Sequence, residues 1–215
     1  MITLLIRLQA PMQSWGISSN FTNRDTTREP TKSGVIGLIC AALGRPRDAD
    51  LSDLACLKMG VRVDREGVLL KDYHIAQDIF LASGKGTKPK PSEPSNRYYL
   101  ADAAFLVGFE GPQDILKEIH HALHSPHWAL YLGRKAFPPG KPVWLKNGLW
   151  QGSLLDAFEK FPSLIPTPED KLRVVLESEE GEFARADVPI NFAERRFSSR
   201  RIHLTSIQAP PHEEV

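Results

Sequence analysis

Residues Pro30 to Gly44 read PTKSGVIGLICAALG, and this stretch predicts the helix around which the rest of the chain is arranged. Thr31 or Ser33 can cap the start of the helix, because either hydroxyl accepts a hydrogen bond from a free backbone N–H. The body from Val35 to Leu43 is apolar on almost every side, which is typical of a helix buried in a protein core.

The start of this helix has two features that a purely buried helix does not need. Gly34 and Gly37 each destabilise a helix interior by about 1 kcal/mol relative to alanine. With Ala41 they form a face of small residues that a ligand or another backbone can approach closely. Lys32 places a cation in the first turn, where it opposes the helix dipole by roughly 0.3–1 kcal/mol. Free N–H groups beside a lysine can form a phosphate site, whereas a tightly packed helix with a solvated lysine explains the same residues. Both interpretations remain open at this stretch.

The composition is that of an ordinary water-soluble protein with a substantial core. The chain has 215 residues, of which 41% are hydrophobic and 25% charged, enough for one large domain or two small ones. The apolar runs are too short to span a membrane and the N-terminus lacks a signal-peptide pattern, so we expect a cytoplasmic protein with no membrane partner. Cys40 and Cys56 lack the spacing of a metal site, and the sequence indicates neither a metal nor a cofactor.

The charged residues are sorted along the chain, although the formal net charge is only +1. Segments 83–97 and 134–146 each have four basic residues, with one acidic residue and none respectively. Segment 185–201 has five basic and two acidic residues, whereas segment 156–182 has eight acidic and three basic ones. Local field rather than net charge attracts phosphate, so this sorting favours a basic face. Solvated loops explain any one basic segment well and all three less well.

A long loop, residues 11–29, follows a predicted central strand. Its amide, aromatic and arginine side chains can stack on bases and pair with phosphates, among them Gln13, Trp15, Arg24 and Arg28. A loop of this length indicates a function. Trp15 taken alone is more readily explained by packing against the core.

Hydrophobic periodicity predicts an α+β fold. The predicted strands are residues 2–8, 59–64, 68–73, 97–109 and 129–132, and the predicted helices are residues 30–44 and 112–124. Glu66-Gly67 indicates a tight hairpin between the second and third of these strands. The resulting order is the ferredoxin-like β-α-β-β-α-β arrangement, whose exposed sheet face often binds RNA.

Residues 143–215 predict a smaller β-rich C-terminal part behind a domain of residues 1–142. We expect a helix at residues 153–161, a hairpin from strands 172–177 and 183–188, and a last strand at residues 202–207.

Segment 77–96, which lies between the predicted hairpin and the predicted strand 97–109, is rich in proline, glycine and lysine. It has few apolar side chains to bury, so we expect an exposed loop or hairpin that a partner orders.

Two further motifs are candidates for chemistry. In YLGRK, Tyr131 to Lys135, a glycine at a strand end allows close backbone approach, and Arg134 with Lys135 can pair with a phosphate there. His120 and His124 have the i, i+4 spacing of a metal pair. Because no acidic third ligand accompanies them at a recognisable offset, a polar helix face is the better interpretation.

Taken together and in this order, several stretches resemble the CasD family, the subunits of type I-E CRISPR Cascade that hold the five-prime handle of the guide RNA. These stretches are LLIRLQAPMQSWG, NRDTTREPTKSGVIGLICAALG, KDYH, YLADAAF, YLGRK and FAERRFSSR. They span nearly the whole chain, and PMQSWG, PTKSGVIGL and YLGRK are the most specific. The resemblance implies a repeat-associated RNA-binding (RAMP) fold with an RRM-like palm, a thumb hairpin inserted at about residues 77–96 and a small C-terminal β part.

The resemblance also implies partners and a path for the RNA. The partners are crRNA, the CasC backbone subunits and the large CasA subunit, with target DNA reached only through the assembled complex. The RNA handle lies between the loop 11–28, the start of the first helix and YLGRK. The residues expected to bind RNA are Gln13, Trp15, Arg24, Arg28, Lys32, Ser33, Gly34, Tyr73, His74, Tyr131, Gly133, Arg134 and Lys135, with Lys85, Lys88, Lys90 and Arg97 in the thumb.

A metal-independent endoribonuclease that processes precursor crRNA is the first rival hypothesis. It needs a general base near a ribose hydroxyl and a cation for the developing charge. The residues that can be nominated are Tyr73, His74, His120, His121 and Lys135. The resemblance is to the branch in which a separate subunit cuts the precursor, so we expect an RNA-binding subunit with no catalytic residues. A stand-alone RNA-binding domain outside CRISPR is the third hypothesis.

Overall fold

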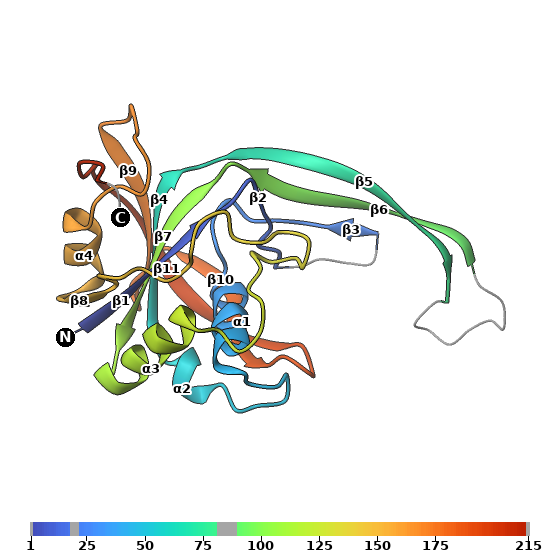
Figure 1. Cartoon of the computed structure of the whole chain (residues 1–215), viewed down its shortest axis with the longest axis horizontal. Coiled ribbons are helices and arrows are strands. Elements are labelled where there is room, and N and C mark those ends of the chain that lie inside the picture. Colours follow the sequence, from blue (N-terminus) through green and yellow to red (C-terminus); the bar gives the residue numbers. More distant parts are fainter. Residues whose placement is uncertain (1, 18–21, 81–89, 214–215) are drawn as a thin grey trace.

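The structure, a computed structural model, describes residues 2–17, 22–80 and 90–213. It is a mixed α+β fold with a seven-stranded sheet in the body and a four-stranded sheet that extends from it (Figure 1). The strand order in the large sheet is β10-β11-β9-β4-β7-β1-β8, and all neighbouring strands in it are antiparallel. None of the helices in the described ranges is long and apolar enough to cross a membrane.

The elements have the following bounds. The large sheet contains β1 (Ile2–Gln9), β4 (Lys58–Arg65), β7 (Ala104–Gly111), β8 (Leu149–Gln151), β9 (Lys171–Glu177), β10 (Phe183–Asn191) and β11 (Arg196–Gln208). The small sheet contains β2 (Met12–Gln13), β3 (Asn23–Arg24), β5 (Val68–Ile79) and β6 (Lys90–Ala101). The helices are α1 (Lys32–Leu43), α2 (Ser52–Ala55), α3 (Gln113–His124) and α4 (Leu154–Lys160).

The predicted central strand and first helix are confirmed. β1 lies between β7 and β8 and is covered on both faces, because Leu4 packs in the cluster with α1 and α3 whereas Leu5 packs with Phe158 of α4. The Thr31 hydroxyl accepts a hydrogen bond from the Gly34 N–H and so caps the start of α1. The helix ends where Gly44 adopts the left-handed conformation, with a φ of 72°.

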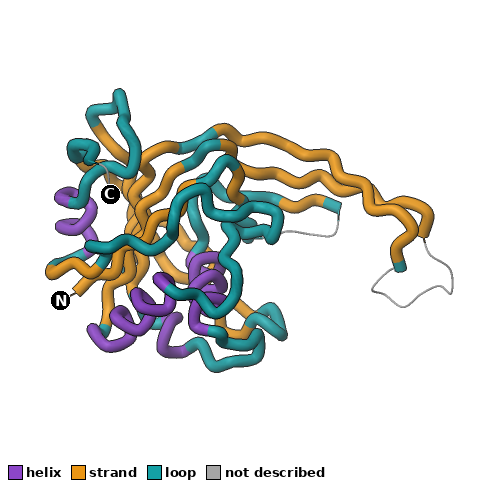
Figure 2. The backbone as a smooth tube through the Cα atoms, viewed as in Figure 1, coloured by secondary structure: helices purple, strands orange, loops and turns teal. Residues whose placement is uncertain are grey.

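The predicted hairpin at Glu66-Gly67 is wrong. Gly67 does form a turn with a φ of 73°, but the turn carries the chain from the large sheet into the small one. β4 pairs with β7 and β9, and β5 pairs with β6 along almost its whole length. In Figure 2 the β5–β6 pair projects from the body as a long curved arm. A turn signal identifies a local reversal but not the strand with which the next segment pairs, so the sequence could not distinguish the two arrangements.

The predicted strand at residues 129–132 is also wrong. Residues 126–148 form no helix or strand, and β8 is the strand that pairs with the free edge of β1. The backbone of this loop bonds to other segments instead: the His127 N–H donates to the Ala42 carbonyl, and the Leu132 carbonyl accepts from the Ser14 N–H. These contacts satisfy the polar backbone groups without a sheet ladder.

The C-terminal strands extend the large sheet and do not pair as predicted. β9 and β10 were expected to form a hairpin, but β11 lies between them and pairs with both. β9 in turn pairs with β4, so the C-terminal strands join the N-terminal ones in one continuous sheet. The acidic residues between β9 and β10 correctly indicated a turn. They could not indicate the strand pairing, because β9 and β10 both pair with β11, which comes later in the chain.

Candidate nucleic-acid interface

A groove of about 430 Å³ runs along one face of α1. Gly34, Gly37 and Ala41 line it, so the small face of the helix is open as predicted. Three further segments line the groove: Arg45 to Arg47 after the helix, Phe192 just after β10, and the loop that carries Trp128, Tyr131, Gly133 and Lys135. The structure thereby brings the helix start and the YLGRK motif together.

The groove is basic and aromatic. Among the described residues that line it, Arg45, Arg47 and Lys135 are basic and none is acidic. The Arg45 guanidinium pairs with Asp53, while Arg47 donates to the Phe192 carbonyl and keeps its charge unpaired among the described side chains. The indole of Trp128 is 47% exposed and the phenol ring of Tyr131 is 38% exposed. Cations beside exposed aromatic faces suit a single-stranded nucleic acid.

The two glycines of α1 have different roles. A Cβ on Gly34 would lie 2.9 Å from the ring of Trp15, so Gly34 makes room for that buried indole. A Cβ on Gly37 would have Phe192 as its nearest neighbour, at the ordinary contact distance of 3.7 Å. Packing therefore explains Gly34 but does not explain Gly37, which faces the groove.

Lys32 is not at the groove, which corrects its predicted role as a phosphate ligand. Its side chain is 1% exposed, and the ammonium pairs with the Glu177 carboxylate at 2.9 Å. The backbone N–H of Lys32 donates to Asp187, whose carboxylate also pairs with Arg200. Burial lowers the pKa of the Lys32 ammonium, and the nearby Glu177 charge partly restores it. A carboxylate of the chain itself therefore occupies the anion site at the start of α1.

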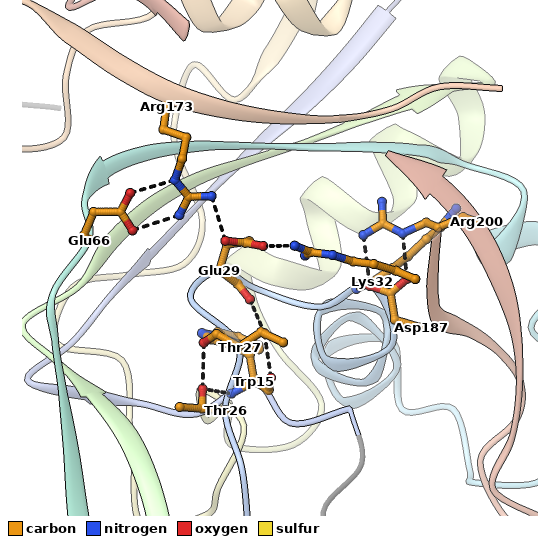
Figure 3. A network of polar contacts seen from close by, with 10 residues as sticks. Trp15, Thr26, Thr27, Glu29, Lys32, Glu66, Arg173, Asp187 and Arg200 are labelled. Carbon is orange, nitrogen blue, oxygen red and sulfur yellow. Dashed lines mark hydrogen bonds and ion pairs between the residues drawn. The ribbon is translucent and has the colours of Figure 1, made fainter. Parts of the chain in front are cut away.

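A second buried network holds the chain just before α1 (Figure 3). The Glu29 carboxylate pairs with Arg185 of β10 and with Arg173 of β9, and Arg173 also forms two hydrogen bonds to Glu66. Burial alone would raise the pKa of Glu29, but the arginine charges and hydrogen bonds outweigh it, and the pKa lies below its ordinary value. The chain before α1 is thereby tied to β9 and β10 and, through Arg173, to the turn after β4.

Gln13 and Trp15 are buried, which corrects their predicted contact with RNA. Gln13 is 0% and Trp15 1% exposed. The Gln13 amide donates to the carbonyls of Leu8 and Ala103, and its oxygen accepts from the Trp15 indole N–H. These two side chains fix the loop after β1, so their polar groups are engaged inside the protein.

The YLGRK motif faces two ways. Lys135 is exposed and lines the groove, whereas the Arg134 guanidinium donates to the backbone carbonyls of Arg24 and Tyr98. Gly133, with a φ of 88°, packs against the backbone of Ser14: a Cβ there would lie 1.7 Å from the Ser14 carbonyl oxygen. The close approach that this glycine permits is therefore to the chain itself. Gly133 also lines the groove, so its contact with a phosphate stays a prediction.

Three arginines gather where the arm leaves the body, with the carboxylates of Asp72 and Asp25 close enough to raise the pKa of Arg134 in part. Arg24 of β3 and Arg97 of β6 are paired across adjacent parallel strands, and Arg134 reaches the Arg24 carbonyl. Burial lowers the pKa of the Arg134 guanidinium, and the charges of Arg97 and Arg24 lower it further. Like charges in such proximity repel one another, and the two carboxylates offset part of that repulsion.

The remaining predicted residues lie on the arm or alone on the surface. Tyr73 is 62% exposed and His74 is also exposed, both on β5. Lys90 pairs with Glu93 at the start of β6. Arg28 is exposed in the loop before α1. Lys85 and Lys88 lie outside the described residues, and Ser33, also predicted, lines the groove.

The residues nominated for a ribonuclease are dispersed. Tyr73 and His74 lie on the arm, Lys135 lies in the groove, and His120 lies on α3. The His120 ring is hydrogen-bonded to the Leu145 carbonyl, and its centroid lies 5.5 Å from that of the Trp144 ring.

Cys40 is a further reactive residue type that lines the groove. Burial raises the pKa of its thiol to about 11, so the thiol stays protonated at neutral pH.

Sequence reasoning missed four residues of the groove. These are Arg45, Arg47, Trp128 and Phe192. The signal that could have revealed Trp128 is its place just after the helix stop at Ser125-Pro126 and close to the YLGRK motif. Phe192 reaches the groove only because the end of β10 lies beside α1 and α2, which no local pattern predicts.

Comparisons with known proteins agree with this architecture. Residues 3–205 match the family described as CRISPR-associated protein (Cas_Cas5). The CRISPR system Cascade subunit CasD of Escherichia coli (strain K12) is 34% identical over 160 residues, which are 66% of this chain and 69% of that protein.

Two solved structures are similar over nearly the whole chain. One, a Cas protein, has a TM-score of 0.82 and 45% identity, covering 98% of both chains. Another, from a CRISPR RNA-guided surveillance complex, has a TM-score of 0.81 and 33% identity, covering 97% of this chain and 91% of its own. The chain therefore belongs to the Cas5 family of CRISPR-associated proteins, which includes CasD.

Proposed function

We propose that this protein is a non-catalytic, RNA-binding subunit of a CRISPR Cascade surveillance complex. In this role it holds the five-prime handle of the crRNA and joins the CasC backbone to the large CasA subunit, and target DNA is met only through the assembly. The observation that carries the proposal is the basic groove beside α1, which has three cations and no carboxylate among its described lining residues. Membership in the Cas5 family and the likeness to a subunit of an RNA-guided complex support it.

We infer a ferredoxin-like palm for the body. In support of this, the strands β8-β1-β7-β4 are neighbours in that order, α1 follows β1, and α3 follows β7. The palm then ends after β8, at about residue 151, later than the boundary at residue 142 that the sequence suggested. The β5–β6 arm is the thumb and is longer than residues 77–96, and the strands β9 to β11 are the C-terminal β part.

A salt titration of RNA binding tests this function. Each phosphate contact to a single strand adds roughly 0.7 to the slope of log affinity against log salt. Lys135→Ala should therefore lower the slope by about 0.7 and weaken all sequences alike, because Lys135 is exposed in the groove and contacts backbone rather than bases. Lys146→Ala is the matched control, since Lys146 is exposed and does not line the groove.

Two outcomes would contradict the proposal. If the purified chain and the reconstituted complex both bind repeat-derived RNA with a slope that Lys135→Ala leaves unchanged, the groove is not the RNA site. If the purified chain alone converts labelled repeat RNA into shorter products, the protein is an endoribonuclease and the assignment as a binding subunit fails.

A further inference from the structure

Trp128 and Tyr131 line two hollows at once. One is the groove along α1, and the other is a second hollow of about 550 Å³. Ala129, Leu130 and Pro138 line the second hollow alone, whereas Ala41, Trp128, Tyr131 and Lys135 line both. Two aromatic residues and a cation are thus common to two cavities, each of the size that proteins use to bind small organic groups, and we call Trp128 and Tyr131 the partition.

The partition is held in place by the end of α1. The N–H groups of His127 and Trp128 donate to the carbonyls of Ala42 and Ala41, at 2.9 and 3.1 Å. These carbonyls belong to the last turn of the helix, where no intrahelical donor is available. The rings of His127 and Trp128 meet edge to face with their centroids 4.9 Å apart, and the His127 ring covers Gly44. Trp128 is therefore exposed but positioned before any ligand binds.

The chemistry of the two hollows selects one kind of occupant. Their described lining is apolar and aromatic with cations, and contains no carboxylate. Nucleobases offer π faces to the aromatic rings, and the linking phosphate offers an anion to Lys135, which makes no ion pair among the described residues. An acidic peptide would satisfy the cation but would leave two aromatic faces without a stacking partner.

We propose that Trp128 and Tyr131 separate two consecutive nucleotides of a bound RNA strand, so that one base enters each hollow and Lys135 contacts the phosphate between them. This inference rests on the proposed function of the groove as an RNA site. It adds to that function a point at which the strand is unstacked and two bases are held apart. Trp128 is then a determinant of base stacking rather than of backbone attraction.

A set of abasic RNAs tests the partition. The probe is a synthetic single-stranded RNA of repeat-derived sequence from which one base at a time is removed. With the wild-type protein, two adjacent abasic positions should each weaken binding by about tenfold, in line with the stacking energy of one base. Trp128→Ala should weaken binding of the intact RNA by about tenfold to a hundredfold, and at one of those two positions removal of the base should then have no further effect. Trp128→Phe should retain most of the affinity, because it keeps an aromatic face.

Controls separate this inference from the proposed function and from a folding defect. Phe183 is 53% exposed and lines neither hollow, so Phe183→Ala should leave the abasic profile unchanged. Thermal melts identify variants that have lost their fold. If the wild-type protein binds no RNA, the proposed function fails. If RNA binding depends on Lys135 but the effects of Trp128→Ala and base removal are additive at every position, only the partition is refuted. The partition would also be refuted if the Trp128→Ala variant kept its RNA affinity but no longer copurified with the other subunits. That result would show that Trp128 contacts a protein.

Discussion

The backbone N–H of Lys32 donates a 2.8 Å hydrogen bond to the carboxylate of Asp187, which lies 155 residues further along the chain. The same carboxylate pairs with Arg200, and the Lys32 ammonium pairs with Glu177. An anion at a helix N-terminus is favoured by the dipole and by the free N–H groups there. The protein satisfies this site internally and uses it to fasten α1 to β9, β10 and β11.

Replacing Lys32 should therefore destabilise the fold, although the sequence suggested the opposite. We expect Lys32→Met to lower the free energy of unfolding by about 3 kcal/mol, because the partly buried Glu177 loses one of its two cations. RNA affinity per folded molecule should not change. Urea unfolding beside an RNA titration provides the measurement, with Lys58→Met as an exposed control. A variant more stable than the wild type would show that the buried pair is not stabilising.

Gly37→Ala should have opposite effects on stability and on binding. In a helix interior alanine is favoured over glycine by about 1 kcal/mol, and the new methyl group would meet only Phe192, at 3.7 Å. The same methyl group would enter the groove, so RNA affinity should fall severalfold. Gly34→Ala is the contrasting variant, because its methyl group collides with Trp15 and should lower the melting temperature. Unchanged affinity of the Gly37 variant would remove this face of α1 from the RNA path.

Gly133→Ala should cost about 3 kcal/mol or more in the free energy of unfolding. Its φ of 88° is unfavourable for alanine, and the Cβ would lie 1.7 Å from the Ser14 carbonyl oxygen, so backbone must move. Gly140→Ala in the same loop is the milder contrast, since its Cβ would meet the Ala10 backbone at 3.3 Å, a tight contact but not an overlap, and its φ is not in the left-handed region. Chemical denaturation of both variants tests the difference, and equal stabilities would refute the structural role of Gly133.

The Glu29 network should make stability fall in acid. The pKa of Glu29 in the folded protein lies below its ordinary value, so the unfolded chain binds the proton first as pH decreases. The stabilisation is fully present above about pH 4.3, the ordinary pKa of glutamate, and is lost as the pH falls through the lower folded value. Glu29→Gln should be less stable than wild type at pH 7, and the gap should narrow in urea melts below pH 4. A gap that is constant with pH would contradict this.

The outer part of the arm should exchange its amide hydrogens faster than the body. Residues 73–79 of β5 pair only with β6 among the described strands, whereas Val61 of β4 is hydrogen-bonded between β7 and β9. A two-stranded ribbon without a third strand is only marginally stable in water. Hydrogen exchange of the free protein and of the complex measures this, and we expect protection of the arm on assembly. Equal exchange of the arm in both states would mean that no partner orders it.

The sequence predicted those parts of the fold whose signals are local. The cap at Thr31, the apolar body of α1 and the glycine end at Gly44 are adjacent in the chain, and the predicted helix is the observed one. β1 was recognised because its residues from Ile2 to Leu8 form a nearly continuous apolar run, and all of them are buried. In both cases a few neighbouring residues determine the structure.

The predictions from the sequence were wrong where residues far apart in the chain determine the local structure. Lys32 was expected at a phosphate because its neighbours in the sequence suit one, but Asp187 and Glu177 reach it from the C-terminal strands. Arg134 and Lys135 are adjacent in the sequence, yet only Lys135 lines the groove. Strand partners, ion-pair partners and the walls of a groove depend on tertiary packing, which periodicity and composition do not encode.

The arm is an insertion within a hairpin that is already complete. β4 and β7 are register partners, and Arg65 at the end of one lies opposite Ala104 at the start of the other, so the chain leaves and re-enters the body at one point. Lengthening or shortening β5 and β6 together would leave every pair of β4 with β7 in place. The strand pairing of the body is therefore independent of the length of the arm. The distance that the arm extends from the body can change without any change in the core.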